Sequence, residues 1–378
     1  MASSPSTRPS TPPTIWSARG RHLGPAAQDV LRLSLRQRKD SRAIDDYLEL
    51  PEAEGAQESA FEARWRVAET VTVRARLTVE HGSGTGQDWV LVAEADAPWD
   101  QRWPSPAAMF WPQDPDATWD HDAATGLRLR DINPLPSDDK AVRSLLRDAA
   151  GDGWSIHVVV HEAMTTDQRG RAPLAGMLPP GLRHRVVEHR AVPSQLRVVN
   201  WALREHDVQV PRGGAVVLPG TPAPSGYDAG DFAVRSVFLD GSEPAELIHA
   251  VTRFAALPRP LPEGAEEALT ALREDWRLLT LEEELARERQ LVAMYAEALE
   301  AMTKSRDLYR DAAEQAHAAL AAYRESAAEA VPEPRPEPSA DAPTSPLQQL
   351  TRTFERLKGT ARTRRAAAEE QPETSDRH

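Results

Sequence analysis

Histidines and carboxylates are the residues of this chain whose side chains could perform chemistry together. The candidate histidines are His157, His161, His184 and His189, and the acidic candidates are Asp120, Asp122 and Glu162. Imidazole and carboxylate groups act as general acids and bases near neutral pH. Glu162 follows His161 at the predicted end of a strand, where functional loops gather. One interpretation is therefore an acid–base site between this strand end and an upstream loop, with His161, Glu162, Asp120 and Asp122 as candidates.

The spacing of the histidines argues against a shared metal ion. The valine-rich run 156–160 predicts a strand, on which His157 and His161 share a face about 13 Å apart at roughly 3.3 Å per residue. Two imidazoles on one zinc must each place a nitrogen about 2 Å from the ion. His184 and His189 fall on opposite faces of the next predicted strand. We therefore predict no metal site and no cofactor.

No sequence pattern indicates a named enzyme class. The chain lacks the G-x-S-x-G, Walker and H-E-x-x-H patterns. The glycines at 82, 84 and 86 resemble a phosphate loop in composition, but such a loop opens a helix. Here the alternating run 70–80 precedes the glycines and the apolar run 89–93 follows them, which predicts a β-hairpin. Whether the protein is an enzyme stays open, and a non-enzymatic role is favoured.

Composition excludes several kinds of site. The absence of cysteine rules out thiol catalysis, disulfides and thiolate metal centres, and it is typical of a cytoplasmic protein. A formal net charge of -13 argues against nucleic-acid binding by the surface as a whole. The sequence contains no apolar run of membrane-spanning length, and its start lacks the apolar core of a signal peptide. The Ala, Arg, Asp and Pro bias is typical of a GC-rich bacterial genome.

The elements that must position the candidate residues predict an α+β fold. Residues 1–15 are predicted to be disordered, and residues 16–260 to form a globular domain with a mixed sheet, because a hairpin precedes alternating strands and helices. Within it lies a Trp/Asp/Pro-rich loop at 96–136. Its tryptophans and aspartates have two interpretations. They could form a ligand site, either a stacking platform for sugars or bases or a carboxylate metal site, or the tryptophans could be large side chains that pin an irregular segment in place.

A long helix over residues 261–331 gives the strongest periodic pattern. Apolar residues recur there in alternating steps of three and four, and the stretch 265–331 contains no glycine or proline. A mean step of 3.5 residues is typical of a coiled-coil seam. The predicted interface comprises Leu278, Leu281, Leu285, Glu288, Val292, Tyr295, Leu299, Met302, Arg306, Tyr309 and Leu320.

Two polar residues in this seam bear on how the helix pairs. A parallel dimer in register would place Glu288 against Glu288 and Arg306 against Arg306, which costs stability. An antiparallel dimer centred near residue 297 would instead pair Glu288 of one chain with Arg306 of the other. Two alternatives stay open: a helix that packs back on its own domain, and a parallel or heteromeric coil.

The C-terminal residues 332–378 combine a proline-rich linker with a basic amphipathic segment. Leu350, Phe354 and Leu357 recur at helical spacing, with Arg356 and Lys358 beside them. This pattern predicts a docking peptide for an acidic partner or an anionic membrane surface, and disorder without a partner is the alternative.

The favoured function is a non-enzymatic scaffold or adaptor. The long helix would bind a second copy or another protein, and the α+β domain would bind a partner or ligand. The alternative is an enzyme of unknown class with the acid–base site at His161.

Overall fold

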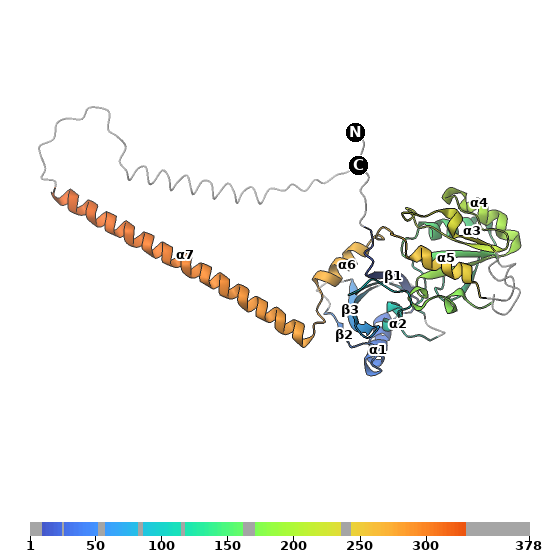
Figure 1. Cartoon of the computed structure of the whole chain (residues 1–378), viewed down its shortest axis with the longest axis horizontal. Helices are drawn as coiled ribbons and strands as arrows, with labels where there is room; N and C mark the ends of the chain where they lie inside the picture. Colours follow the sequence, from blue (N-terminus) through green and yellow to red (C-terminus); the bar gives the residue numbers. More distant parts are fainter. Residues whose placement is uncertain are drawn as a thin grey trace, which may run out of the picture. The chain divides into compact units, whose positions relative to one another are not determined.

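The computed structural model describes residues 10–24, 26–51, 57–81, 86–114, 118–161, 171–235 and 243–329. The chain forms two units, residues 1–287 and residues 288–378. The first unit contains two β-sheets, and a long helix, α7, extends into the second (Figure 1). The predicted α+β class, with a mixed-sheet domain followed by a long helix, is confirmed. The predicted tail at 332–378 lies outside the described residues.

The first sheet has five antiparallel strands in the order β1-β5-β4-β3-β2. The predicted hairpin is β4 and β5, with Val79 opposite Trp89. The strands are β1 (Ile15–His22), β2 (Asp46–Glu49), β3 (Glu58–Val67), β4 (Val71–Glu80) and β5 (Gln87–Ala95). Helices α1 (Ala27–Asp40) and α2 (Pro106–Phe110) cover one face of this sheet.

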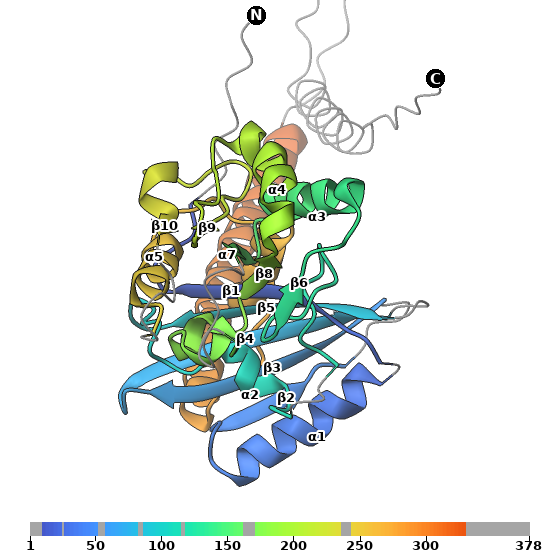
Figure 2. The same ribbon diagram turned by 90° about the vertical axis from the view of Figure 1, so that its right-hand side faces the viewer.

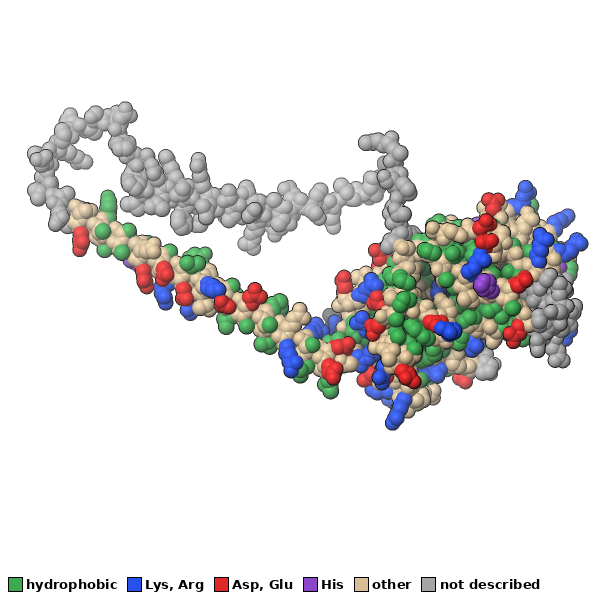
Figure 3. Space-filling model, in the orientation of Figure 1, with side chains coloured by type: hydrophobic (Ala, Val, Ile, Leu, Met, Phe, Trp, Pro, Cys, Tyr) green, Lys and Arg blue, Asp and Glu red, His purple; other side chains and the backbone are tan. Residues whose placement is uncertain are grey.

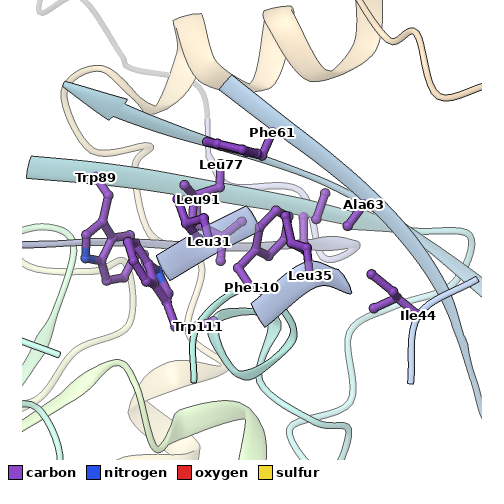
Figure 4. Close-up of a cluster of buried hydrophobic side chains, with 14 of the residues drawn as sticks. Leu31, Leu35, Ile44, Phe61, Ala63, Leu77, Trp89, Leu91, Phe110 and Trp111 are labelled. Atoms are coloured by element: carbon purple, nitrogen blue, oxygen red, sulfur yellow. The ribbon is translucent and has the colours of Figure 1, made fainter. Parts of the chain in front are cut away.

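The core under α1 depends on alternation along the strands. Phe61 on β3, Leu77 on β4 and Leu91 on β5 point towards Leu31 of α1 and Phe110 of α2 (Figure 4). Successive strand side chains face opposite sides, so one face can be wholly apolar. Burial of that face supplies the main stabilisation of the sheet.

Tryptophans complete this core. Trp111 and Trp119 are buried and stack with ring centroids 5.7 Å apart, while Trp89 of β5 packs against both. The Nε1 of Trp119 donates a hydrogen bond to the carbonyl of Pro112. These contacts support the interpretation in which large rings pin the irregular segment 96–136 in place.

The second sheet is mixed, in the order β10-β9-β7-β8-β6. Strand β8 lies parallel to β6 and β7, whereas β9 lies antiparallel to β7 and β10. Its strands are β6 (Ile132–Pro134), β7 (Ile156–His161), β8 (Val186–Ala191), β9 (Gly214–Val217) and β10 (Ala233–Arg235).

Helices cover both faces of the second sheet. Val158 and Val160 of β7 pack towards α5 (Ala245–Ala255), and Val159 packs towards α3 (Asp139–Gly151) and α4 (Leu196–Ala202). Figure 2 shows α5 on one side of this sheet and α3 and α4 on the other. This two-sided burial explains why the middle of β7 is the apolar run Val158–Val160. Short 3₁₀ helices lie at Leu174–Gly176, Pro180–Leu182, Pro193–Gln195, Leu203–His206 and Ala229–Phe232.

The structure divides the predicted helix at 261–331 into two helices. These are α6 (Ala265–Glu274) and α7 (Leu281–Glu329), and residues 275–280 between them are not helical. Helix α6 packs on the first sheet, so the globular part extends beyond the predicted boundary at 260. Thr280 and Glu283 form a capping box, since the Glu283 N–H donates to Thr280 Oγ1 and the Thr280 N–H donates to Glu283 Oε2.

Leu278 is therefore not part of the long helix, which corrects its assignment to the coiled-coil interface. Its side chain is 8% exposed and packs in the domain core with Trp276, Leu269 and Leu272. The spacing of three residues between Leu278 and Leu281 fits the heptad pattern by coincidence. Leu278 belongs to the domain core and precedes Thr280, the first residue of the capping box, by two residues.

Glu62 holds this connecting segment against the first sheet. Its side chain, 0% exposed, accepts hydrogen bonds from the backbone N–H groups of Arg277 and Leu278, each at 2.9 Å. The guanidinium of Arg76 lies 3.7 Å from the other carboxylate oxygen. A central strand residue thus fixes the place where α7 begins.

Replacing Glu62 with alanine should release the segment 275–280. Two backbone N–H groups would lose their acceptor, at a cost of roughly 1–3 kcal/mol in the free energy of unfolding. Amide hydrogen exchange at Arg277 and Leu278 should accelerate, and the exposed Glu58→Ala on the same strand should leave it unchanged. Unchanged exchange in Glu62→Ala would show that apolar packing alone holds the segment.

Candidate functional site

Helix α7 carries an exposed apolar stripe along its 49 residues. Apart from Leu23, Leu33 and Trp201, every large apolar side chain that the described residues leave exposed lies on this helix. Green apolar side chains recur along it between charged ones in Figure 3. The exposed residues are Leu281, Leu285, Val292, Met294, Tyr295, Leu299, Met302, Leu308, Tyr309, Leu320 and Tyr323.

Most of these residues occupy the predicted seam, which we call the heptad stripe: residues 281, 285, 288, 292, 295, 299, 302, 306, 309 and 320. Tyr309 is 75% exposed, so the stripe presents large apolar surface that an isolated helix cannot bury. Contiguous exposed apolar surface of this kind marks interaction sites. Glu288 and Arg306 interrupt it, and Arg306 pairs with its neighbour Asp307 at 3.0 Å. A surface ion pair of that type contributes about 0–1 kcal/mol, so it does not prevent another pairing.

His161 lies at the end of β7, buried, where its Nδ1 accepts a hydrogen bond from the Gly213 N–H at 3.2 Å. Glu162, its predicted neighbour in a catalytic pair, lies outside the described residues. His157 occupies the other end of β7, and the structure brings Asp122 to His157 rather than to His161.

Asp120 belongs to a buried ion pair. Its Oδ2 accepts from Arg130 at 2.9 Å, and Arg128 lies 3.7 Å from its Oδ1. Arg130 also stacks over the Trp119 ring, 5.2 Å from the centroid. Asp120 therefore serves to neutralise two cations beside the tryptophan core, and this arrangement explains its place in an otherwise irregular segment.

Asp122 joins a second buried network. Its Oδ1 accepts from the Ser155 hydroxyl at 2.7 Å, and its Oδ2 accepts from the Thr125 hydroxyl and N–H. Ser155 in turn donates its N–H to Asp152. The loop at 122–125 is thereby tied to the start of β7.

Asp152 connects this network to two histidines. Its carboxylate accepts from the Trp154 and Ser155 N–H groups, a local turn typical of aspartate, and contacts His157 Nε2 at 3.3 Å. His157 Nδ1 lies 3.0 Å from His189 Nε2 on the neighbouring strand. A chain Asp152–His157–His189 therefore crosses from α3 to β8.

Burial and neighbouring groups shift the pKa values of Asp152 and His189, the two ends of this chain. Burial acts to raise the pKa of Asp152, but the hydrogen bond and charge of His157, with the two backbone donors, outweigh it and leave that pKa below its usual range. Burial, followed by repulsion from His157, lowers the pKa of His189 well below its usual value. The network thus contains an ionised carboxylate and a neutral imidazole.

Asp122, Asp152 and His157 present ligand atoms within 4.8 Å of one another. The expectation of no metal came from the spacing of the histidines, and the carboxylate alternative did not include Asp152, so both missed this grouping. The carboxylates are nonetheless engaged by protein donors at all four oxygens. These hydrogen bonds tie the loop at 122–125 to the turn at 152–155 without a metal ion.

Sequence reasoning missed Asp152, Ser155 and the contact between His157 and His189. Only the aspartate carries a local signal, since Asp152 stands at the end of a predicted helix ahead of a strand. The contact between the histidines depends on the parallel register of β7 and β8, in which Val159 lies opposite His189. The predicted tail residues Leu350, Phe354, Leu357, Arg356 and Lys358 lie outside the described residues.

Comparison of the chain with models of known protein families and with curated proteins found no match. Among the described residues, no helix is both long and apolar enough to cross a lipid bilayer.

Proposed function

We propose that this chain is a non-enzymatic scaffold or adaptor that self-associates through the heptad stripe of α7, with the α+β domain as a partner- or ligand-binding module. The observation that carries the proposal is the exposure of nearly every seam residue on one uninterrupted helix. Burial of apolar surface contributes about 25 cal/mol per Å², so a second helix packed on the stripe would bind with a substantial favourable free energy from the buried apolar area. A cytoplasmic location, consistent with the absence of cysteine, belongs to the same proposal.

The occupant that fits the stripe best is a second copy in antiparallel orientation. With the centre near residue 297, Glu288 of one chain faces Arg306 of the other, and Tyr295 faces Leu299. The same centre pairs Val292 with Met302 and Leu285 with Tyr309. Because Leu278 lies in the domain core, the paired region is residues 281–313 and ends with Leu281 opposite Ala313. Opposite charges and complementary side-chain sizes therefore meet throughout this region.

Reversing one charge in the stripe should weaken the dimer. Glu288→Arg would place arginine against Arg306 at two symmetric layers, and we expect the dissociation constant to rise at least about tenfold, or ~1.4 kcal/mol. Adding Arg306→Glu should return the dissociation constant to the wild-type value, because the arginine at 288 then faces a glutamate at 306 and the two charges again have opposite signs. Sedimentation equilibrium of the full chain measures both effects.

Glu297→Arg is the matched control, since it makes the same change of charge on the helix outside the heptad stripe. It should leave the dissociation constant unchanged. A wild-type chain that stays monomeric at micromolar concentration, or a double variant no better than Glu288→Arg, would contradict the antiparallel pairing. Dimerisation that is insensitive to all three variants would favour another register or orientation.

The basic segment at 347–378 supplies the second contact of the proposed adaptor. Its cations lie beside an apolar face, a combination that complements an acidic protein or an anionic membrane surface. Its binding is expected to weaken with salt.

A further inference from the structure

A cavity of about 500 Å³ lies beside β1 and the connection from α5 to α6. Its walls include Ile15, Trp99 and Leu257 together with several prolines. The charged side chains among its lining residues are Arg185 and Arg259, and no aspartate or glutamate lines it within the described residues. A purely cationic cavity is notable in a chain with a net charge of -13.

Arg185 reaches the cavity from the residue before β8. It is only 7% exposed, and its Nε has no hydrogen-bond partner among the residues that the structure describes. The contact it does make is with the face of Trp16, 5.9 Å from the ring centroid. Its backbone carbonyl accepts from the Ile156 N–H at 2.6 Å, so the place of the side chain is fixed by the second sheet.

Arg259 lines the same cavity from the segment after α5. Its guanidinium lies 5.7 Å from the centroid of Phe254, and in the described part of the chain it makes no ion pair. Its backbone carbonyl accepts from the Thr11 N–H at 2.8 Å. Two arginines from separate segments, each with its backbone carbonyl hydrogen-bonded, thus line one cavity.

The protein itself compensates these charges incompletely. Burying an ion without a partner is unfavourable, and a cation–π contact offsets only part of that cost. Burial, with repulsion from Arg259, lowers the pKa of Arg185, and burial lowers the pKa of Arg259 to about 10. Asp152 opposes both shifts, but its oxygens already accept from Trp154, Ser155 and His157.

Neutral donors face the cavity as well. Trp99 lines it, and its buried Nε1 has no hydrogen-bond partner among the described residues. Ser10, Thr11 and Ser17 add hydroxyl groups from the same side as β1. Guanidinium forks and N–H or O–H donors around an apolar wall are the groups that recognise phosphate and carboxylate oxygens.

We propose that this cavity binds a small organic molecule carrying a doubly charged oxyanion, as a phosphate monoester does, between Arg185 and Arg259. The apolar wall at Ile15, Trp99 and Leu257 would receive the rest of the molecule, since a volume of this size suits a small ligand. This inference rests on the proposed binding role of the α+β domain and gives it a ligand class. It is independent of self-association, because no residue of α7 lines the cavity.

Titration of the full-length chain with inorganic phosphate, at ionic strength held constant with chloride, tests the site. Calorimetry should give saturable binding, and phosphate should raise the unfolding temperature. Arg185→Gln and Arg259→Gln should each weaken binding at least about tenfold, as expected for loss of a charged hydrogen-bond donor. Arg36→Gln, the same change at an exposed arginine of α1, should bind phosphate like the wild type.

A second measurement separates a ligand site from a structural arginine. Without phosphate, Arg185→Gln should unfold at the same temperature as the wild type or higher, because the substitution removes an uncompensated buried charge. A lower unfolding temperature would mark Arg185 as a structural residue and overturn the proposal. Phosphate binding that is absent in the wild type, or equal in the three variants, would overturn it too.

Malonate distinguishes the two oxyanion chemistries. If malonate binds at the same arginines more weakly than phosphate does, the phosphate assignment is supported. If malonate binds more tightly, that assignment is overturned in favour of a dicarboxylate. Sedimentation of the same samples reports self-association separately, so failure of the phosphate site leaves the dimer proposal standing and the reverse also holds.

Discussion

Replacing Asp152 with alanine is expected to lower the free energy of unfolding by about 3–5 kcal/mol, the usual cost of removing one partner from a buried ionic network. The Asp152 side chain is 7% exposed and serves two backbone N–H groups and His157. Its loss would leave all three donors without their acceptor. It would also remove the negative charge that favours the charged forms of Arg185 and Arg259.

Chemical denaturation of Asp152→Ala measures this loss. Asp148→Ala is the control, because Asp148 is exposed on the last turns of α3 and its removal should change stability by no more than about 0.5 kcal/mol. The free energy of unfolding of Asp152→Asn should lie between those of Asp152→Ala and Asp148→Ala, since the amide oxygen still accepts from one backbone donor. Equal stability of Asp152→Ala and Asp148→Ala would show that the network does not stabilise the fold.

Acid is expected to destabilise the domain through His184 before most carboxylates titrate. Burial, with repulsion from Arg130 and Arg183, lowers the pKa of His184 from 6.5 to about 3. Between pH 6.5 and pH 3, His184 is therefore protonated in the unfolded chain but neutral in the folded chain. The stability is fully present above pH 6.5 and is lost as the pH falls towards 3. From pH 7 to pH 5 the expected loss is about 2 kcal/mol, and over the whole shift it is about 4–5 kcal/mol.

His184→Phe isolates this contribution. The ring packs 5.1 Å from Trp119, and neither nitrogen has a hydrogen-bond partner in the described part of the chain, so phenylalanine preserves the packing and removes the titration. Denaturation at several pH values should give a flatter curve for this variant. His249→Phe, at an exposed position, should keep the wild-type slope.

The contribution of His184 is the difference between the stability–pH curve of the wild type and that of His184→Phe. Burial raises the pKa values of Glu62 and Glu188, and these carboxyls favour the folded state as the pH falls. They act equally in the wild type and in His184→Phe, so they cancel in the comparison. Parallel curves would show that His184 titrates normally in the folded protein.

The proposed self-association and the proposed ligand binding would use separate parts of the chain. The heptad stripe begins after the capping box at Thr280 and Glu283, whereas the cavity lined by Arg185 and Arg259 lies beside β1 and the connection from α5 to α6. Glu62 connects them structurally, because it fixes the segment from which α7 begins. An adaptor of this kind would present its binding module from a defined point on each helix.

The sequence by itself determined the elements whose signals are local. The heptad stripe of α7 follows from side chains three and four residues apart, and the β4–β5 hairpin follows from alternation on either side of a glycine-rich turn. Alternation at Phe61, Ala63 and Trp65 carries the same local signal for β3. The break before α7 also has a local cause in the capping box at Thr280 and Glu283.

Only the tertiary structure decided which distant residues meet. His157 contacts His189 because β7 and β8 are parallel and in one register, which no local pattern specifies. Asp122 contacts Ser155 and lies close to Asp152 and His157, although these residues are distant from it in the sequence. His161, four residues after His157 on β7, is not part of this group. Arg185, just before β8, and Arg259, after α5, line the same cavity although they lie far apart in the sequence. Local sequence sets each segment's conformation, whereas burial against remote segments sets the chemistry of its side chains.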